Sequence, residues 1–207
     1  KMKNIKAIIF DLGAVILNIN YQNTIDEFGK IGIQNASSYY SKKAQNSLFN
    51  QIETGEISDK EFLLKLQKET TNINIKQVED AWNAMLLDLP ENRINLLKKL
   101  KNNYSIFLLS NTNSIHISEF KKRLGNNQYN KFYNLFNKVY YSHKIGFRKP
   151  QSEAFQIILD ENKLLANEVF FIDDSYQHIK GAEKLGIKTH HLQENEEITT
   201  LFPDIVL

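Results

Sequence analysis

The segment IKAIIFDLGAV, residues 5–15, decides the fold class of this chain. Ile5 to Phe10 is rich in β-branched residues and almost continuously apolar, which is typical of a strand covered on both faces in a parallel sheet. Asp11 puts a carboxylate at the carboxyl end of that strand, and Gly13 permits a tight backbone turn directly after it. The segment therefore predicts a central parallel strand that ends beside a candidate site.

Four further apolar runs predict more strands, and helical patterns separate them. The strand candidates are Tyr104–Leu109, Val139–Ser142, Glu168–Ile172 and Ile187–Leu192. Ile94, Leu97 and Leu100 repeat at helical spacing, and we expect Pro150 in the first turn of another helix. This alternation predicts an α/β fold, a doubly wound, Rossmann-like parallel sheet with its chemistry at the carboxyl ends of the strands.

The long segment between the first two strand candidates breaks the alternation, because it contains helical patterns and no convincing strand. Ser58, with Glu61 three residues later, predicts the start of one of its helices. We therefore expect an inserted all-helical cap domain, residues 19–89, on an α/β core domain of residues 1–18 and 90–207. Its position after the first strand would let the cap fold over the carboxyl edge of the sheet.

Polar residues follow the other strand candidates or open a helix. Ser110-Asn111-Thr112-Asn113 supplies hydroxyl and amide groups suited to phosphate oxygens, or else a cap for the helix behind it. Gly146-Phe147-Arg148-Lys149-Pro150 puts two cations before a helix. Asp173 and Asp174 are adjacent carboxylates after a buried strand, and they need a cation because like charges raise each other's pKa.

The order of these motifs, with a helical insertion after the first, resembles that of the haloacid dehalogenase-like hydrolase superfamily, most of whose members are phosphatases. The resemblance implies that Asp11 is the nucleophile and forms an aspartyl-phosphate intermediate. It also implies that Ser110 and the backbone N–H of Asn111 bind phosphoryl oxygens. Lys149 would lie against the phosphate and offset charge in the transition state.

Magnesium is the cofactor that the resemblance implies. Asp174, with Asp173 in direct or water-mediated support, would hold Mg²⁺ together with Asp11 and the backbone carbonyl of Gly13. All these ligands are oxygen, and a phosphate oxygen can complete the octahedron that Mg²⁺ requires.

Gly13 departs from the pattern of most phosphatases in the superfamily, which have there a second Asp that serves as general acid and base. A subgroup that resembles bacterial α-D-glucose-1-phosphate phosphatases shares this glycine and the other motifs. The expected activity is hydrolysis of a small phosphorylated metabolite, a sugar phosphate such as glucose 1-phosphate. Two alternatives stay open: a metal-independent haloacid dehalogenase, against which the pair Asp173 and Asp174 argues, and a catalytically silent binding or regulatory member of the same fold.

Composition excludes several other classes of protein. The 26 basic and 24 acidic residues leave a net charge of +2, which argues against a nucleic-acid binder driven by bulk charge. The chain has no cysteine and no apolar run long enough to cross a bilayer. We expect a cytoplasmic monomer or homodimer that binds a small phosphorylated metabolite and neither nucleic acid nor membrane. The five histidines show no metal-ligand spacing, although His178 could approach the site, and Trp82 is expected in the core of the cap.

Overall fold

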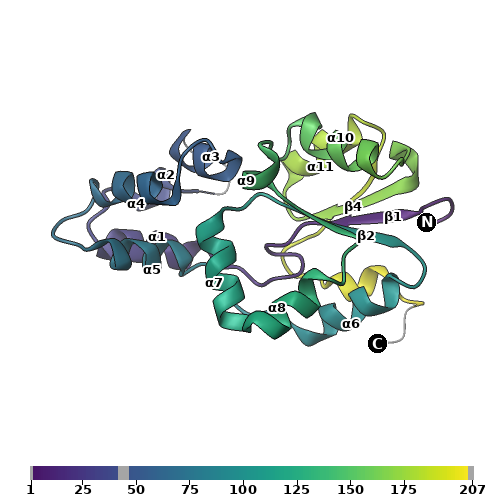
Figure 1. Cartoon of the computed structure of the whole chain (residues 1–207), viewed down its shortest axis with the longest axis horizontal. Helices are drawn as coiled ribbons and strands as arrows, with labels where there is room; N and C mark the ends of the chain where they lie inside the picture. The colour runs from purple at the N-terminus through teal and green to yellow at the C-terminus, as the bar shows by residue number, and fades with distance from the viewer. Residues whose placement is uncertain (1, 42–46, 205–207) are drawn as a thin grey trace.

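The computed structural model describes residues 2–41 and 47–204, and its centre is one parallel sheet in the order β3-β2-β1-β4-β5 (Figure 1). The strands are β1 (Ala7–Phe10), β2 (Ser105–Ser110), β3 (Lys138–Tyr141), β4 (Val169–Asp173) and β5 (Lys188–His191). Each overlaps one of the five predicted runs. The predicted doubly wound sheet is therefore confirmed.

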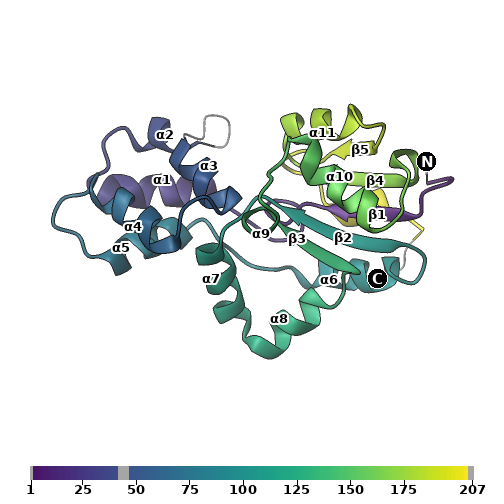
Figure 2. The same cartoon turned by 45° about the horizontal axis from the view of Figure 1, so that its top comes forward.

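Both faces of the sheet are covered by helices, as the apolar sequence of β1 requires. Ile8 and Phe10 pack with residues of α6 (Glu91–Leu100), α7 (Ser114–Leu124) and α8 (Asn126–Tyr133) on one face. Ala7 and Ile9 pack with α10 (Ser152–Glu161) and α11 (Tyr176–Glu183) on the other. Figures 1 and 2 show these two helical layers on opposite sides of the sheet. The short helix α9 (Ser142–Ile145) follows β3, and 3-10 turns span Ala166–Glu168 and Ile198–Leu201.

Between β1 and α6 the described residues form five helices that lie to one side of the sheet, and we refer to residues 19–89 as the cap (Figure 2). They are α1 (Tyr21–Lys30), α2 (Ala36–Tyr39), α3 (Ser47–Thr54), α4 (Asp59–Gln67) and α5 (Ile75–Asn83). Ser58 and Glu61 form the predicted capping box at the start of α4. The described part of the cap contains no strand, only an isolated bridge between Ile19 and Leu86. The domain boundaries themselves stay a prediction.

Trp82 occupies the middle of an aromatic cluster that joins the cap to the core. Its side chain is 1% exposed and packs on Phe49 within the cap. On the core side it stacks on His116 of α7, with ring centroids 4.3 Å apart, and its Nε1 donates to Asn113 Oδ1. The prediction that Trp82 belongs to the cap core is confirmed. His116 lies in the first turn of α7, where its side chain is buried.

The prediction for Pro150 was wrong. Helix α10 begins at Ser152, after a turn in which Gln151 N–H donates to the carbonyl of Arg148. The side chain of Gln151 accepts from the N–H of Arg148, so this turn is closed locally before the helix starts. None of the helices within the described residues combines the length and the apolar character needed to span a bilayer.

Candidate active site

The register of the sheet brings the predicted motifs together. Phe10 of β1 pairs with Leu108 on one side and with Ile172 on the other. One residue further along each strand, Asp11 therefore lies between Leu109 and Asp173. This is the carboxyl edge of the sheet at the point where the strand order reverses, the usual binding position in doubly wound folds.

Lys149 inserts its side chain into this row and is completely buried. Its Nζ donates to Asp11 Oδ1 at 2.8 Å, to the carbonyl of Leu109 at 2.8 Å and to Asp173 Oδ2 at 2.7 Å. Burial disfavours the ammonium, but Asp11 and Asp173 outweigh it and hold the pKa of Lys149 above its ordinary value. An ammonium group has three donors, and each of them has a partner here.

The side chain of Asn111 fixes the backbone of Lys149. Its Oδ1 accepts from Lys149 N–H at 2.8 Å, and its Nδ2 donates to the Lys149 carbonyl at 2.9 Å. The role that we expected for Asn111 uses only its backbone N–H, so this contact is compatible with it. Ser110 ends β2 and is buried at the cavity wall, where a hydroxyl could meet a phosphoryl oxygen.

Three carboxylates form an acidic cluster beside Lys149. Asp11, Asp173 and Asp174 each have a ligand atom within 4.8 Å of the others. Burial and the neighbouring Asp173 raise the pKa of Asp11, although Lys149 opposes this. Burial also disfavours the ionised form of Asp173, but Lys149 and His178 hold its pKa below the ordinary range.

The two neighbouring aspartates differ in what they contact. Asp173 is completely buried, and its carboxylate accepts from Lys149 Nζ, from Ser175 N–H and from His178 Nδ1. Asp174 is only half-buried and lines the cavity. An all-oxygen set made of Asp11, Asp174 and a backbone carbonyl fits Mg²⁺, and Asp173 is better placed to orient Lys149 and His178.

Gly13 lines the same cavity, and Ile19 occupies the space beside it. A Cβ atom on Gly13 would stand 2.4 Å from Ile19 Cδ1 and 3.5 Å from Ile19 Cγ1. The left-handed residue of the turn is Ala14, with φ of 63°, and not Gly13. The tight turn expected after Asp11 is present, but its left-handed residue is Ala14, and the space beside Gly13 is limited by the apolar side chain of Ile19.

Asn113 has the role of a helix cap that the sequence left open. It is the N-cap of α7, and its Oδ1 accepts from His116 N–H at 3.0 Å. His178 approaches the site, as its sequence position suggested, with Nδ1 at 3.0 Å from Asp173 Oδ2.

The cavity between cap and core has a volume of about 160 Å³, and part of its wall was not foreseen from the sequence. Glu53 and Asn50 of α3 reach it from the cap. Arg148 of the core donates from Nε to Glu53 Oε2 at 2.6 Å and from one terminal nitrogen to Asn50 Oδ1 at 2.9 Å. The signal for Glu53 was its spacing, because it shares a helical face with the buried Phe49 and Ile52.

Comparison with known proteins shows which proteins this chain resembles. The chain is 26% identical over 186 residues to a protein named D-ribitol-5-phosphate phosphatase from Bacteroides thetaiotaomicron, covering 89% of this chain and 90% of that protein. An aspartate-to-alanine mutant of a haloacid dehalogenase family enzyme from the same organism was crystallised with magnesium and inorganic phosphate. It superposes with a TM-score of 0.88 at 33% identity, covering 96% of this chain and 98% of that one.

A haloacid dehalogenase-like hydrolase from Porphyromonas gingivalis gives a TM-score of 0.84 at 29% identity, covering 98% of this chain and 99% of that one. The family model for haloacid dehalogenase-like hydrolases matches residues 8–191, which include every motif described above. The chain therefore belongs to the haloacid dehalogenase-like hydrolase family.

Proposed function

We propose that this protein is a Mg²⁺-dependent phosphatase that hydrolyses the phosphomonoester of a small hydroxyl-bearing metabolite, a sugar phosphate or a sugar-alcohol phosphate. The proposal rests mainly on one observation: Asp11 and Asp173, at the ends of β1 and β4, share the buried ammonium group of Lys149. Ser110 and Asp174 lie at the wall of the same cavity. The similarity to a named ribitol-phosphate phosphatase and to an enzyme crystallised with magnesium and phosphate supports this proposal. Glucose 1-phosphate and ribitol 5-phosphate are both candidate substrates.

In this proposal Asp11 attacks the phosphorus atom. Its Oδ1 accepts from Lys149 Nζ and from Leu12 N–H, both at 2.8 Å, and these two bonds fix the plane of the carboxylate. A carboxylate oxygen forms the bond to phosphorus as the bond from phosphorus to the ester oxygen breaks, and the leaving alkoxide takes a proton from water. Water then attacks the phosphorus of the aspartyl-phosphate, which releases inorganic phosphate and restores Asp11.

Charge on the phosphoryl group is offset from several sides. Ser110 Oγ and the N–H of Asn111 would donate to its oxygens, and the Lys149 ammonium is held beside Asp11 in a dry environment where electrostatic stabilisation is strong. Asp11, Asp174 and the Gly13 carbonyl would hold Mg²⁺, which when bound supplies a further positive charge for the phosphoryl oxygens. Asp173 would keep Lys149 in position.

The metal-independent dehalogenase alternative is disfavoured by the acidic cluster, because a haloacid reaction without metal gives Asp174 no function beside Asp11 and Asp173. The catalytically silent alternative rests on Gly13, which offers no side chain as proton donor. The other predicted catalytic residues all lie in or beside the cavity, so we favour an active enzyme.

The test is release of inorganic phosphate from a panel of glucose 1-phosphate, glucose 6-phosphate, ribitol 5-phosphate and phenyl phosphate, with Mg²⁺ or with excess chelator. We expect turnover that requires Mg²⁺ and is lost in Asp11→Asn, a folded variant whose amide is a poor nucleophile. Equal rates in the presence of chelator, or near-normal rates in Asp11→Asn, would contradict the proposal. The absence of turnover on every ester would favour the silent alternative.

A further inference from the structure

Glu53 places a buried carboxylate in the cavity from the cap side. It belongs to α3, which packs against α9 where the cap meets the core (Figure 1). The residue is 6% exposed, and the guanidinium of Arg148 holds its Oε2 at 2.6 Å. Asn50, one helical turn earlier, accepts from the same guanidinium at 2.9 Å. These contacts fix the carboxylate in one orientation.

The second carboxylate oxygen of Glu53 is available to a ligand. No donor among residues 2–41 and 47–204 reaches Oε1, and Glu53 lines the cavity. Burial raises the pKa of Glu53, and the Arg148 guanidinium opposes this rise. The ion pair with Arg148 at 2.6 Å favours the carboxylate form, which only accepts hydrogen bonds. A carboxylate oxygen that is open to the cavity can accept a hydrogen bond from water or from a ligand that enters the cavity.

The charge on Glu53 excludes the phosphoryl group as that ligand, because a carboxylate repels a phosphate dianion. Glu53 must therefore face the part of the substrate beyond the phosphoryl group. Arg148 already balances its charge, so an ammonium on the substrate would meet the guanidinium at the same place. A neutral donor, the hydroxyl of a polyol, satisfies Oε1 without that repulsion.

We propose that Glu53 is a specificity-determining residue that accepts a hydrogen bond from a hydroxyl group on the leaving group of the substrate, with Arg148 and Asn50 as positioning residues. This inference rests on the proposed phosphatase function. A site built to bind a hydroxyl group discriminates strongly against analogues that lack it, because its own polar group is then left without a partner. Glu53 would thus select sugar and sugar-alcohol phosphates over alkyl and aryl phosphates.

The test compares ribitol 5-phosphate, which carries hydroxyl groups, with phenyl phosphate, which carries none. In Glu53→Gln we expect kcat/KM for ribitol 5-phosphate to fall about tenfold or more, mainly through KM, because a neutral amide is a weaker acceptor than a carboxylate. For phenyl phosphate it should change less than about twofold, since that ester makes no such bond.

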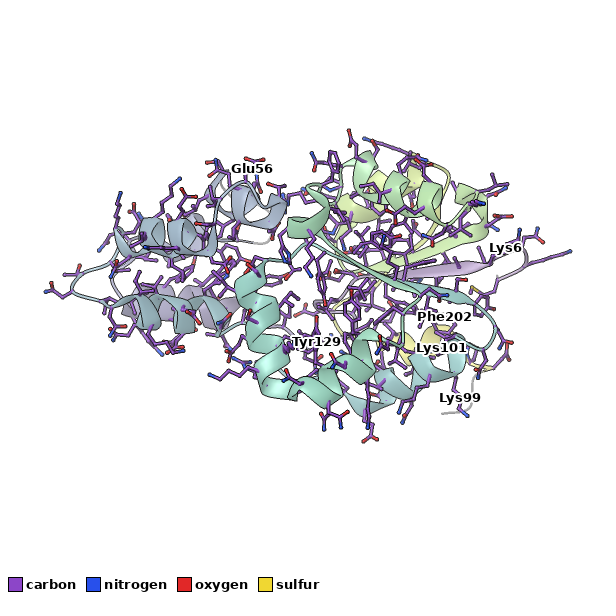
Figure 3. All side chains as sticks on the ribbon, viewed as in Figure 1. Lys6, Glu56, Lys99, Lys101, Tyr129 and Phe202 are labelled. Atoms are coloured by element: carbon purple, nitrogen blue, oxygen red, sulfur yellow. The ribbon has the colours of Figure 1, made fainter. Side chains whose placement is uncertain are left out.

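Glu56→Gln is the matched control. Glu56 follows the same helix but is exposed on the outer surface of the cap, where Figure 3 labels it, and its carboxylate accepts from Thr54 Oγ1. This variant removes the same charge close by and should leave both esters unaffected.

The outcomes separate the two proposals. If kcat/KM fell equally for both esters in Glu53→Gln, Glu53 would only hold the cap in place. If kcat/KM changed for neither ester, the specificity role would likewise be overturned. If the wild type released phosphate from neither ester nor from glucose 1-phosphate, the phosphatase function itself would fail, and this inference with it. Thermal unfolding of each variant shows whether its fold is intact. If Glu53→Gln does not fold, Asn50→Ala replaces it, because this variant loosens the positioning of the Arg148 guanidinium. It should lower kcat/KM for ribitol 5-phosphate and not for phenyl phosphate.

Discussion

Restoring a carboxylate at position 13 should give the enzyme a general acid, provided that Ile19 makes room for it. A Cβ atom at Gly13 would meet Ile19 Cδ1 at 2.4 Å, whereas Cγ1 is 3.5 Å away, an ordinary van der Waals distance. Ile19→Val removes the Cδ1 methyl group and keeps the rest of the side chain. The double variant Gly13→Asp with Ile19→Val therefore removes the close contact that a Cβ atom at position 13 would make.

The cost and the gain of this change can be bounded. An Ile-to-Val substitution costs about 0.5–1.5 kcal/mol, and Ile19 is only partly buried, so the lower end applies. The new carboxyl group would stand near the cluster of Asp11, Asp173 and Asp174, and such like charges raise its pKa toward the range of a useful acid. General acid catalysis contributes about 10²–10⁴-fold, which is the ceiling for the gain on poor leaving groups.

The assay is the slope of log rate against leaving-group pKa over a series of aryl and alkyl phosphates, in wild type, both single variants and the double variant. We expect a steep decline in the wild type, so that sugar 1-phosphates, with their more acidic anomeric oxygen, react faster than 6-phosphates. The double variant should flatten the slope by accelerating the poorest leaving groups most. Gly13→Asp alone should gain less, and Ile19→Val alone should keep the slope of the wild type.

Two results would refute this reasoning. A shallow slope already present in the wild type would mean that another group or an ordered water protonates the leaving oxygen. A folded double variant that gains nothing on alkyl phosphates would mean that a carboxylate at position 13 does not reach the leaving oxygen. The relative named for ribitol 5-phosphate makes this comparison informative, because that ester has a primary alcohol as its leaving group.

Substitutions at Asp174, Lys149 and His116 test the metal site, the buried ion pair and the pH dependence of stability. Asp174→Asn should raise the Mg²⁺ concentration needed for half-maximal activity, measured by titrating chelated enzyme, and an unchanged requirement would exclude Asp174 as a ligand. Lys149→Met should lower the free energy of unfolding in chelator by about 3–5 kcal/mol in urea titrations, because two buried carboxylates lose their cation; a loss below about 1 kcal/mol would show that the pair is solvated. Burial lowers the pKa of His116 to about 4, whereas a His in the unfolded chain has a pKa of about 6.5. As the pH drops from about 6.5 to about 4, the unfolded chain therefore binds the proton first, and the free energy of unfolding should fall by up to about 3 kcal/mol. His116→Gln should lose that part of the pH dependence.

The sheet could be predicted from the sequence because its strands are short apolar runs that end in polar motifs. The structure has strand β1 where the sequence predicts it, because a strand that is buried on both faces is a continuous run of apolar residues. The positions of Asp11 and Lys149 followed from the order of the motifs. What the pattern could not supply was the partner of each side chain, such as the carboxamide of Asn111 on the backbone of Lys149.

The contribution of the cap could not be predicted in the same way, because it depends on how the insertion packs on the core. Glu53 resembles any other glutamate of a solvent-exposed helix until its contact with Arg148 is known. Its position on the same face as Phe49 and Ile52 was a usable signal, since a charged residue on an apolar helical face needs a buried partner. For Gly13 no local signal existed, because Ile19 lies six residues later at the entry to the cap.

These positions divide the chemistry of the site between two sets of residues. The core carries Asp11, which follows β1, and Lys149, which lies in the loop before α10, so both partners of this ion pair belong to the core. Ile19 and Glu53 come from the insertion and line the same cavity, and our proposal places Glu53 against the substrate beyond its phosphoryl group. In this proposal the two sets of residues act on different parts of the substrate, so changes in the insertion alter which leaving group is accepted while the residues around the phosphoryl group stay intact. Two experiments test this division of roles. The variants at position 13 test how the rate depends on the acidity of the leaving oxygen, and Glu53→Gln tests how it depends on the hydroxyl groups of the leaving group.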